Sequence, residues 1–324
     1  MVLRYHAIAV TFMTVIIACL GSADERDFLL EKVPAEKLDS ATSSISPNEL
    51  NFYNSAHQDV SGGALISVGT FRALNNAATG DFLEIYLLDV NESVVHFNAK
   101  HLELIARSAN RYAYLSNLYH DPKVGEAIKA FDEGRATGKK VGDKISRAIN
   151  KLKRLKIEPF QMQDGYVYSM HRIIQDTNTY HSSFLGSDKY FGQLKKLVDS
   201  KRIFAVPGSL SGRHVMAWLG KRLQKRGVHV SVLDISNVLD YMPRDRQKRS
   251  FANNLLRLPW SKASKIHFTI DHDRIPTVKW GYSWSYYSMS LSDFMKHKLY
   301  WWPQELKHNN SSTCISKSLY KMLY

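Results

Sequence analysis

The 324-residue sequence has little cysteine, and this scarcity limits the sites that it can contain. Its two cysteines, Cys19 and Cys314, exclude a zinc site built from cysteine thiolates and exclude a framework of disulfides. Cys19 lies in an N-terminal segment that we expect to be removed or modified, so the folded body would keep one thiol. The count is compatible with an oxidising compartment but does not require one.

Acidic residues are also scarce, since 30 Asp and Glu stand against 44 Lys and Arg and give a net charge of +14 at pH 7. This balance favours acidic partners such as nucleic acid, phospholipid headgroups or an anionic small molecule. A basic, solvated surface without a specific partner explains the charge equally well. Apolar residues at 44% and charged residues at 23% are typical of a globular chain, which excludes a disordered protein and a membrane bundle.

Long apolar runs are missing beyond the N-terminus, because charges, glycine or proline interrupt each of them, and this excludes a later membrane span. At the N-terminus, Arg4 precedes an uncharged apolar run over 7–20, and small residues follow up to Ala23. The pattern predicts a signal peptide over 1–23 and an exported protein, periplasmic or secreted. Two alternatives stay open: a lipoprotein lipidated at Cys19, and an uncleaved anchor or buried helix.

The segment after the signal alternates between apolar strands and helices. Residues 24–60 are polar and predict an N-terminal arm. Strands are then expected over 64–68 and 82–88, and helices over 71–78 and 92–107. Strand, helix, strand and helix in this order predict a parallel βαβ unit with right-handed crossovers.

The pattern changes over about 108–190, where a helical insertion is expected, and then alternation resumes. Further strands are expected over 203–206, 228–235 and 265–270, with helices over 214–226 and 246–256. Repeated alternation predicts the α/β class, with a doubly wound, mostly parallel sheet in a domain over 61–275. The aromatic-rich residues 276–324 are expected to supply antiparallel edge strands and a tail.

Polar and small residues follow several of the predicted strands. In an open α/β sheet, ligands bind outside the carboxyl ends of the strands, near the point where the strand order reverses. Gly69 would let backbone N–H groups approach a ligand closely, and Asp89 could accept both hydroxyls of a ribose. Gly208, Ser209 and Asn237 follow the third and fourth strands.

These strand ends carry a resemblance to a known family. The segments at 67–70 and 88–91 resemble the glycine loop and the acidic second-strand end of class I S-adenosylmethionine-dependent methyltransferases. Residues 206–209 resemble the segment that faces the adenine, and 231–241 resemble the fourth strand with its polar exit. More specifically, about half of the chain resembles an uncharacterised bacterial family of methyltransferase-like proteins.

The resemblance implies a Rossmann-like fold, S-adenosylmethionine as the cofactor, and no metal. It implies that Gly69 lines the amino-acid end of the cofactor, that Asp89 holds the ribose, and that Asn237 and Tyr241 lie at the catalytic mouth. The full set of cofactor-binding residues that it implies is Gly69, Thr70, Asp89, Asn91, Gly208 and Ser209.

The chain departs from the methyltransferase pattern in two places. The loop has one glycine where the family has two or three, and Phe71 and Arg72 place bulk where the cofactor would pass. Ser209 replaces the aspartate after the third strand. Simpler interpretations also stay open: a tight turn at Gly69, a helix cap at Asp89, and a capping pair formed by Ser236 and Asn237.

Two other chemistries find weaker patterns. Residues 208–212 form a strand-to-helix turn, but Leu210 stands where a hydrolase would have its serine, and Ser211 suits a helix N-cap. A metal could be held at the fifth strand end by four side chains, although polar strand ends usually face water: His267, Asp271, His272 and Asp273.

Two surface features favour binding rather than catalysis. A basic helix is expected over 139–156, with Lys139 and Lys156 at its ends; it could contact an anionic membrane or nucleic acid, or be a solvated face. Aromatic residues alternate at period two from Trp280 to Tyr286, which suits an edge strand that packs in the core or stacks on sugars or bases.

Two functions therefore compete. The first is an exported methyltransferase-like enzyme acting on an unknown acceptor; because S-adenosylmethionine is a cytosolic metabolite, it would work in the cytosol of another cell or keep its signal and stay inside. The second is a non-enzymatic exported binding protein of degenerate Rossmann fold that contacts an anionic polymer or membrane. The oligomeric state is open.

Overall fold

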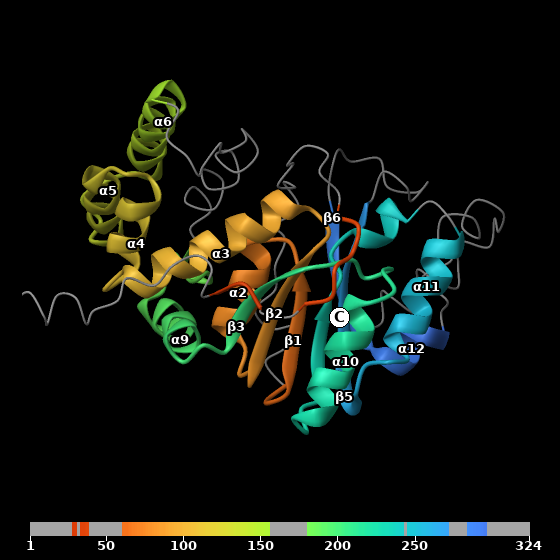
Figure 1. The fold of residues 1–324 in the computed structure, drawn as a ribbon. Helices are drawn as coiled ribbons and strands as arrows, with labels where there is room; N and C mark the ends of the chain where they lie inside the picture. Colours follow the sequence, from red (N-terminus) through yellow and green to blue (C-terminus); the bar gives the residue numbers. More distant parts are fainter. Residues whose placement is uncertain are drawn as a thin grey trace, which may run out of the picture.

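The computed structural model describes residues 28–30, 33–38, 60–155, 180–242, 245–271 and 284–296. In this part of the chain, six strands form one sheet in the order β3-β2-β1-β4-β5-β6 (Figure 1). The strands are β1 (Ala64–Val68), β2 (Glu84–Asp89), β3 (Ile203–Pro207), β4 (Val230–Asp234), β5 (Trp260–Asp271) and β6 (Trp284–Ser290).

The first five strands pair in parallel, and β6 pairs antiparallel with β5. The predicted α/β class with a mostly parallel sheet is therefore confirmed. The predicted signal peptide, both cysteines and the last 28 residues, 297–324, lie outside the described part.

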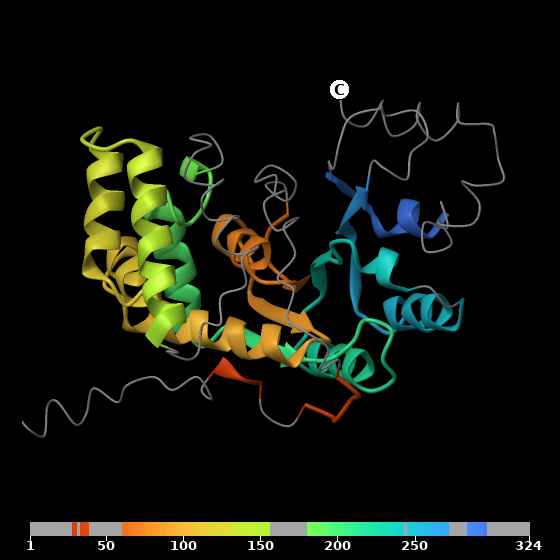
Figure 2. The ribbon, with the colours of Figure 1, turned by 90° about the horizontal axis from the view of Figure 1, so that it is seen from above.

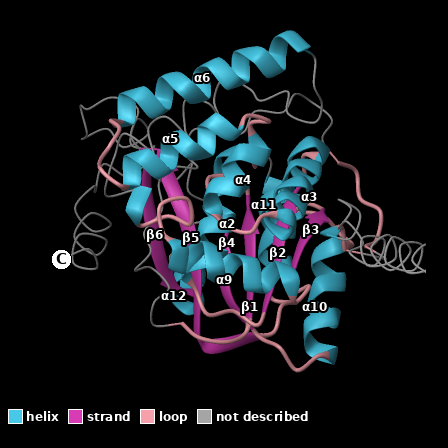
Figure 3. Cartoon of the chain, turned by 90° about the vertical axis from the view of Figure 1, so that its left-hand side faces the viewer, coloured by secondary structure: helices cyan, strands magenta, loops and turns pink. Residues whose placement is uncertain are grey.

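Nine α-helices and one 3-10 turn accompany the sheet in the described residues. The helices are α2 (Phe71–Thr79), α3 (Glu92–Arg107), α4 (Arg111–Leu118), α5 (Pro122–Asp132), α6 (Gly138–Leu155), α9 (Asp188–Asp199), α10 (Val215–Lys225), α11 (Asp245–Leu255) and α12 (Leu291–Lys296), and the turn is η4 (Val238–Tyr241). Figure 3 shows the strands between these helices, with α6 set apart from the sheet.

The sheet is buried on both faces. Successive side chains of a strand point to opposite sides, so neighbouring residues enter different cores. On β1, Leu65 belongs to one core with residues of α2, α3 and α9, whereas Ile66 belongs to a second core with residues of α10 and α11. Burial on both faces explains why the central strands are continuous apolar runs rather than alternating ones.

The insertion helices α4, α5 and α6 lie together on the side of the sheet where β3 is the outermost strand (Figures 1 and 2). Arg111 of α4 is almost fully buried and joins these helices to α9: its guanidinium lies 2.6 Å from Asp132 and 2.7 Å from Asp188. The predicted basic helix corresponds to α6, whose apolar stripe, including Ile145 and Ile149, is buried. No helix in the described ranges is both long and apolar enough to cross a bilayer.

A buried histidine joins α3 to α4 and makes stability depend on pH. His101 is 1% exposed, and its Nδ1 lies 2.5 Å from the hydroxyl of Tyr114. Burial lowers the pKa of His101 to about 3 from its ordinary 6.5. Between these two pH values the unfolded chain binds one more proton than the folded chain, so stability that is complete above pH 6.5 is lost as the pH falls toward 3.

We therefore expect His101→Gln to flatten the acid limb of the stability curve. The free energy of unfolding of the native sequence should fall by about 1.4 kcal/mol more per pH unit than that of the variant between pH 6 and pH 4. Urea unfolding at several pH values measures this slope. His96→Gln, on the exposed side of the same helix, is the control and should keep the native slope. Equal slopes for the native chain and His101→Gln would contradict the account.

Candidate functional site

The candidate site lies where the strand order reverses. From β1 the chain proceeds to β2 and β3 on one side, and then to β4 and β5 on the other, so the carboxyl ends of β1 and β4 flank the switch point (Figure 1). Gly69 follows β1 with φ of +93°, and Ser236 follows β4 with φ of +51°. Both residues therefore have the left-handed backbone conformation, which Gly69 adopts freely and Ser236 adopts under strain.

Asp89 stabilises the turn after β1 through hydrogen bonds to backbone N–H groups. Its carboxylate accepts from the backbone N–H of Gly69 at 3.3 Å and from the backbone N–H of Asn91 at 2.9 Å. The side chain of Asn98, on α3, donates to the carbonyl of Gly69 at 2.9 Å. The N-cap of α3 is Asn91, whose side chain accepts from the backbone N–H of Ser93, so the interpretation of Asp89 as that cap is wrong.

A buried ion pair lies beneath this turn. Asp234, the last residue of β4, is fully buried and accepts from Arg72 Nε at 3.1 Å and from Asn76 Nδ2 at 2.8 Å. The hydroxyl of Ser67 on β1 and the backbone N–H of Ser236 also donate to it, at 3.2 and 3.0 Å. The pair therefore fixes the start of α2 against the ends of β1 and β4.

The bulk of Phe71 and Arg72 is turned into the protein. Arg72 has no exposed surface, and Phe71 packs against Phe184 with ring centres 5.1 Å apart. Thr70, the residue before α2, is also buried, and its carbonyl accepts from the backbone N–H of Leu74 at 2.9 Å. The side chains of these three residues are therefore buried beneath the turn after β1.

The side-chain amide of Asn237 uses its oxygen but not its nitrogen in hydrogen bonds. The residue is 7% exposed, and its Oδ1 accepts from Ser236 Oγ at 3.1 Å. Its Nδ2 has no partner among the described residues, and neither has the hydroxyl of buried Thr269, whose backbone N–H donates to the carbonyl of Ser236. A buried donor without a partner costs about 1–3 kcal/mol. Strain and an unsatisfied donor at one strand end point to a site that an acceptor atom of a ligand completes.

The two other predicted residues near this point are placed as follows. Tyr241 ends η4, and its side chain lies outside the described part. Gly208 donates its backbone N–H to the carbonyl of Asp89 at 2.8 Å, and a Cβ at Gly208 would lie 2.7 Å from the side chain of Val215. A glycine is therefore needed at Gly208 for α10 to pack closely against the end of β3.

The end of β3 is occupied by the N-terminal arm. Leu29 forms a bridge with Ala205, so the arm runs along β3. Farther along the arm, the carboxylate of Glu36 accepts from the backbone N–H groups of Ser209, His214 and Val215 at 2.9, 2.7 and 3.0 Å. These groups stand at the N-terminus of α10, where the helix dipole favours an anion.

Glu36 therefore caps α10 from a distant part of the chain. His214 is the N-cap residue and makes no capping bond with its own side chain, so the interpretation of Ser211 as the cap is wrong. A Cβ at Gly212 would lie where the Glu36 carboxylate lies, so a larger residue at Gly212 would displace that carboxylate. The hydroxyls of Ser209 and Ser211 lie 3.2 Å apart.

Glu36→Ala should lower the free energy of unfolding by about 2 kcal/mol, because three backbone N–H groups lose a charged acceptor at a helix N-terminus. Chemical denaturation measures the loss, and limited proteolysis should cut the arm faster in the variant. Lys37→Ala removes an exposed neighbouring side chain and is the matched control. Equal stability of the two variants would show that the arm does not cap α10.

The remaining predicted features receive little structural support. His267 is buried on β5, whereas the side chain of Asp271 and residues 272–273 lie outside the described part. In the described ranges, no group of three or more side chains of the metal-binding types comes together. Binding of an anionic surface by α6 stays a prediction, as does export.

The structure also adds three residues that the sequence analysis did not place at the site, which are Glu36, Asn98 and Asp234, and it pairs Arg72 with the last of them. Charged residues inside apolar stretches were the available signal for Arg72 and Asp234, since a buried charge needs a partner.

Comparison with known proteins gives a family without an assigned activity. Residues 45–315 match the family described as a domain of unknown function (DUF7790). The matched range includes the whole switch point and begins after Glu36. No curated protein matches the chain.

Proposed function

We propose that the chain, which belongs to the DUF7790 family, binds S-adenosylmethionine at the ends of β1 and β4 and transfers its methyl group to an acceptor. The observation that carries the proposal is the buried Nδ2 of Asn237, a donor without a partner beside strained Ser236. An oxygen atom of the cofactor or of the acceptor would satisfy this donor and recover its desolvation cost.

The residues at the switch point suit the two polar ends of this cofactor. Asp89 is partly exposed and uses its carboxylate for two backbone N–H groups. A carboxylate at the end of the second strand is the type of acceptor that binds ribose hydroxyls, and we propose that Asp89 does so. Gly69, in the left-handed conformation, lets the amino-acid end approach the backbone closely.

The N-terminal arm supplies a carboxylate near Ser209, which has none of its own. The methyltransferase resemblance implies an aspartate after the third strand, and Ser209 stands there instead. The carboxylate of Glu36 is bonded to the backbone N–H of Ser209, so it offers an acceptor at that strand end. Glu36 is partly exposed, and we propose that it contributes to the adenine side of the site.

The sheet also supports a Rossmann-like interpretation. Its order β3-β2-β1-β4-β5 reverses once, which is the arrangement that binds nucleotides at the crevice between the central strands. Antiparallel β6 at the far edge is compatible with doubly wound folds.

The chain's own groups would hold and orient the reactants. The bound cofactor supplies an electrophilic methyl group on a positively charged sulfur. Asn237 would fix an oxygen of the acceptor or of the cofactor through Nδ2, while the Arg72–Asp234 pair keeps the end of β4 in place. Because that pair carries no net charge, it adds no repulsion toward a cationic cofactor.

Calorimetric titration of the folded protein with S-adenosylmethionine tests the proposal. We expect saturable binding, and binding of the demethylated product S-adenosylhomocysteine at the same site, shown by competition. ATP shares the adenosine group but not the amino-acid end, and it should bind more weakly. Absence of heat with protein that is folded by circular dichroism would reject the proposed function.

A further inference from the structure

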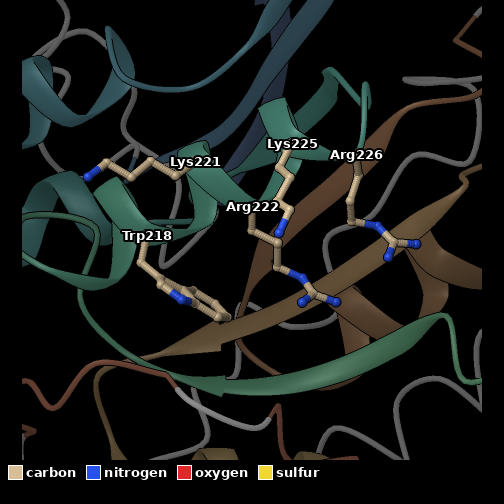
Figure 4. A pocket seen from close by; sticks show the side chains of 5 residues that line it. All are labelled: Trp218, Lys221, Arg222, Lys225 and Arg226. Carbon is tan, nitrogen blue, oxygen red and sulfur yellow. The ribbon is translucent and has the colours of Figure 1, made fainter.

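The outward face of α10 is a second candidate site, unrelated to the switch point. Its inward side, which includes Met216 and Leu219, is buried against the sheet. Its outward side borders a hollow of about 470 Å³ that is lined by one aromatic residue and four cations (Figure 4): Trp218, Lys221, Arg222, Lys225 and Arg226.

Two of these cations are held in place. Arg222 Nε donates to the hydroxyl of Tyr86 at 3.2 Å, and its guanidinium lies 5.9 Å from the ring centre of Trp218 and 5.9 Å from that of Phe204. Arg226 forms an ion pair with Glu84, whose side chain is buried. Cations fixed in this way lose little conformational entropy when an anion binds.

The two lysines supply uncompensated charge. Lys221 and Lys225 are exposed, and neither forms an ion pair with another described residue. Lys221 also borders an adjoining hollow of about 450 Å³, which Arg257 lines. The two hollows are lined by five cations, and one acid, Glu84, forms an ion pair with one of them.

Helix stability alone does not explain the arrangement. Cations near a helix C-terminus interact favourably with its dipole, which accounts for Arg222, Lys225 and Arg226. It does not account for Arg257 on another segment, or for the half-buried indole of Trp218 beside the cations.

We propose that this α10 groove binds single-stranded nucleic acid, with phosphates held by Lys221, Arg222 and Lys225 and one base stacked on Trp218. A row of cations beside an aromatic ring is the combination that recognises single strands without sequence preference. Because the apolar side of α10 is buried, this helix cannot lie in a membrane as an amphipathic helix does. α6 is also basic but carries no aromatic residue.

The groove is separate from the proposed cofactor site. Arg226 pairs with Glu84, the first residue of β2, so the hollow reaches the amino end of the sheet, whereas Asn237 lies at the carboxyl end. Either site can therefore fail its test without affecting the other.

Fluorescence anisotropy with a labelled oligothymidylate tests the groove. The double variant Lys221→Gln/Lys225→Gln should weaken binding roughly 25-fold at about 0.1 M salt and lower the salt slope by about 1.4, since each phosphate contact on a single strand contributes about 0.7. The matched control Lys140→Gln/Lys151→Gln removes the same charge from exposed positions of α6 and should change affinity less than about twofold.

Trp218→Leu separates stacking from charge. It should weaken binding roughly tenfold and leave the salt slope unchanged, because a stacked base contributes no counterion release. Equal weakening by the two double variants would show dependence on net charge alone and would overturn the proposal. So would an unaltered affinity of Trp218→Leu, or tighter binding of phosphatidylglycerol vesicles or heparin that depends on Lys221 and Lys225. Circular dichroism confirms that each variant is folded.

Discussion

Asp234→Ala should lower the free energy of unfolding by about 3–5 kcal/mol, because it leaves the guanidinium of Arg72 buried without its counter-charge. Neither side chain has any exposed surface. Asn76 and Ser67 lose an acceptor at the same time, since both donate to the same carboxylate oxygen. Chemical denaturation followed by circular dichroism measures the loss.

An exposed acid gives the matched control. Glu133 pairs with Arg135 at the surface, so Glu133→Ala should cost less than about 1 kcal/mol. A double variant, Arg72→Met/Asp234→Val, keeps the test informative if Asp234→Ala does not fold. Because replacing both charges leaves no buried ion, the double variant should be more stable than Asp234→Ala. Similar losses for Asp234→Ala and Glu133→Ala would show that the buried pair does not organise the site.

Asn237→Ala should weaken the binding of S-adenosylmethionine and leave the stability of the fold nearly unchanged. We expect the affinity for S-adenosylmethionine to fall about tenfold, which corresponds to a hydrogen bond of about 1.4 kcal/mol. The free energy of unfolding should change by less than about 1 kcal/mol, since the variant loses one bond from Ser236 but also removes an unsatisfied buried donor. Titration calorimetry and chemical denaturation measure the two quantities on the same preparation.

Asn117→Ala is the control for this variant, because its side chain donates to the hydroxyl of Ser108 in the insertion and lies away from the switch point. It should leave cofactor affinity unchanged. If Asn237→Ala lost stability and kept its affinity, Asn237 would be a structural residue, and the role proposed for it would be wrong.

Local patterns predicted much of the sheet and its helices. The strand over 64–68 and the helix over 92–107 have the predicted bounds, because a short apolar run marks the strand and apolar residues at a period of 3.6 mark the helix. The fifth strand is longer than predicted and begins at Trp260, since a register shift accommodates its polar start. Helix α5, within the insertion, and helix α9, which follows it, were not predicted.

The candidate site was only partly predictable, because its decisive contacts are far apart in sequence. Gly69 and Asp89 were expected near one another from the order of the strands, and the structure brings them into contact. The bond from Arg72 to Asp234 spans 162 residues, and that from Ser209 to Glu36 spans 173. No periodicity in the sequence encodes such pairs, which arise when strand order and helix placement are known.

Hydrogen exchange with and without S-adenosylmethionine tests the central claim most directly, because it locates the ligand without a substitution. We expect slower exchange in peptides that contain Gly69, Asp89 and Asn237, and unchanged exchange in the peptide of α6, which serves as an internal reference. Protection confined to other peptides, or none at a saturating ligand concentration, would contradict the assignment of the cofactor site to the ends of β1 and β4.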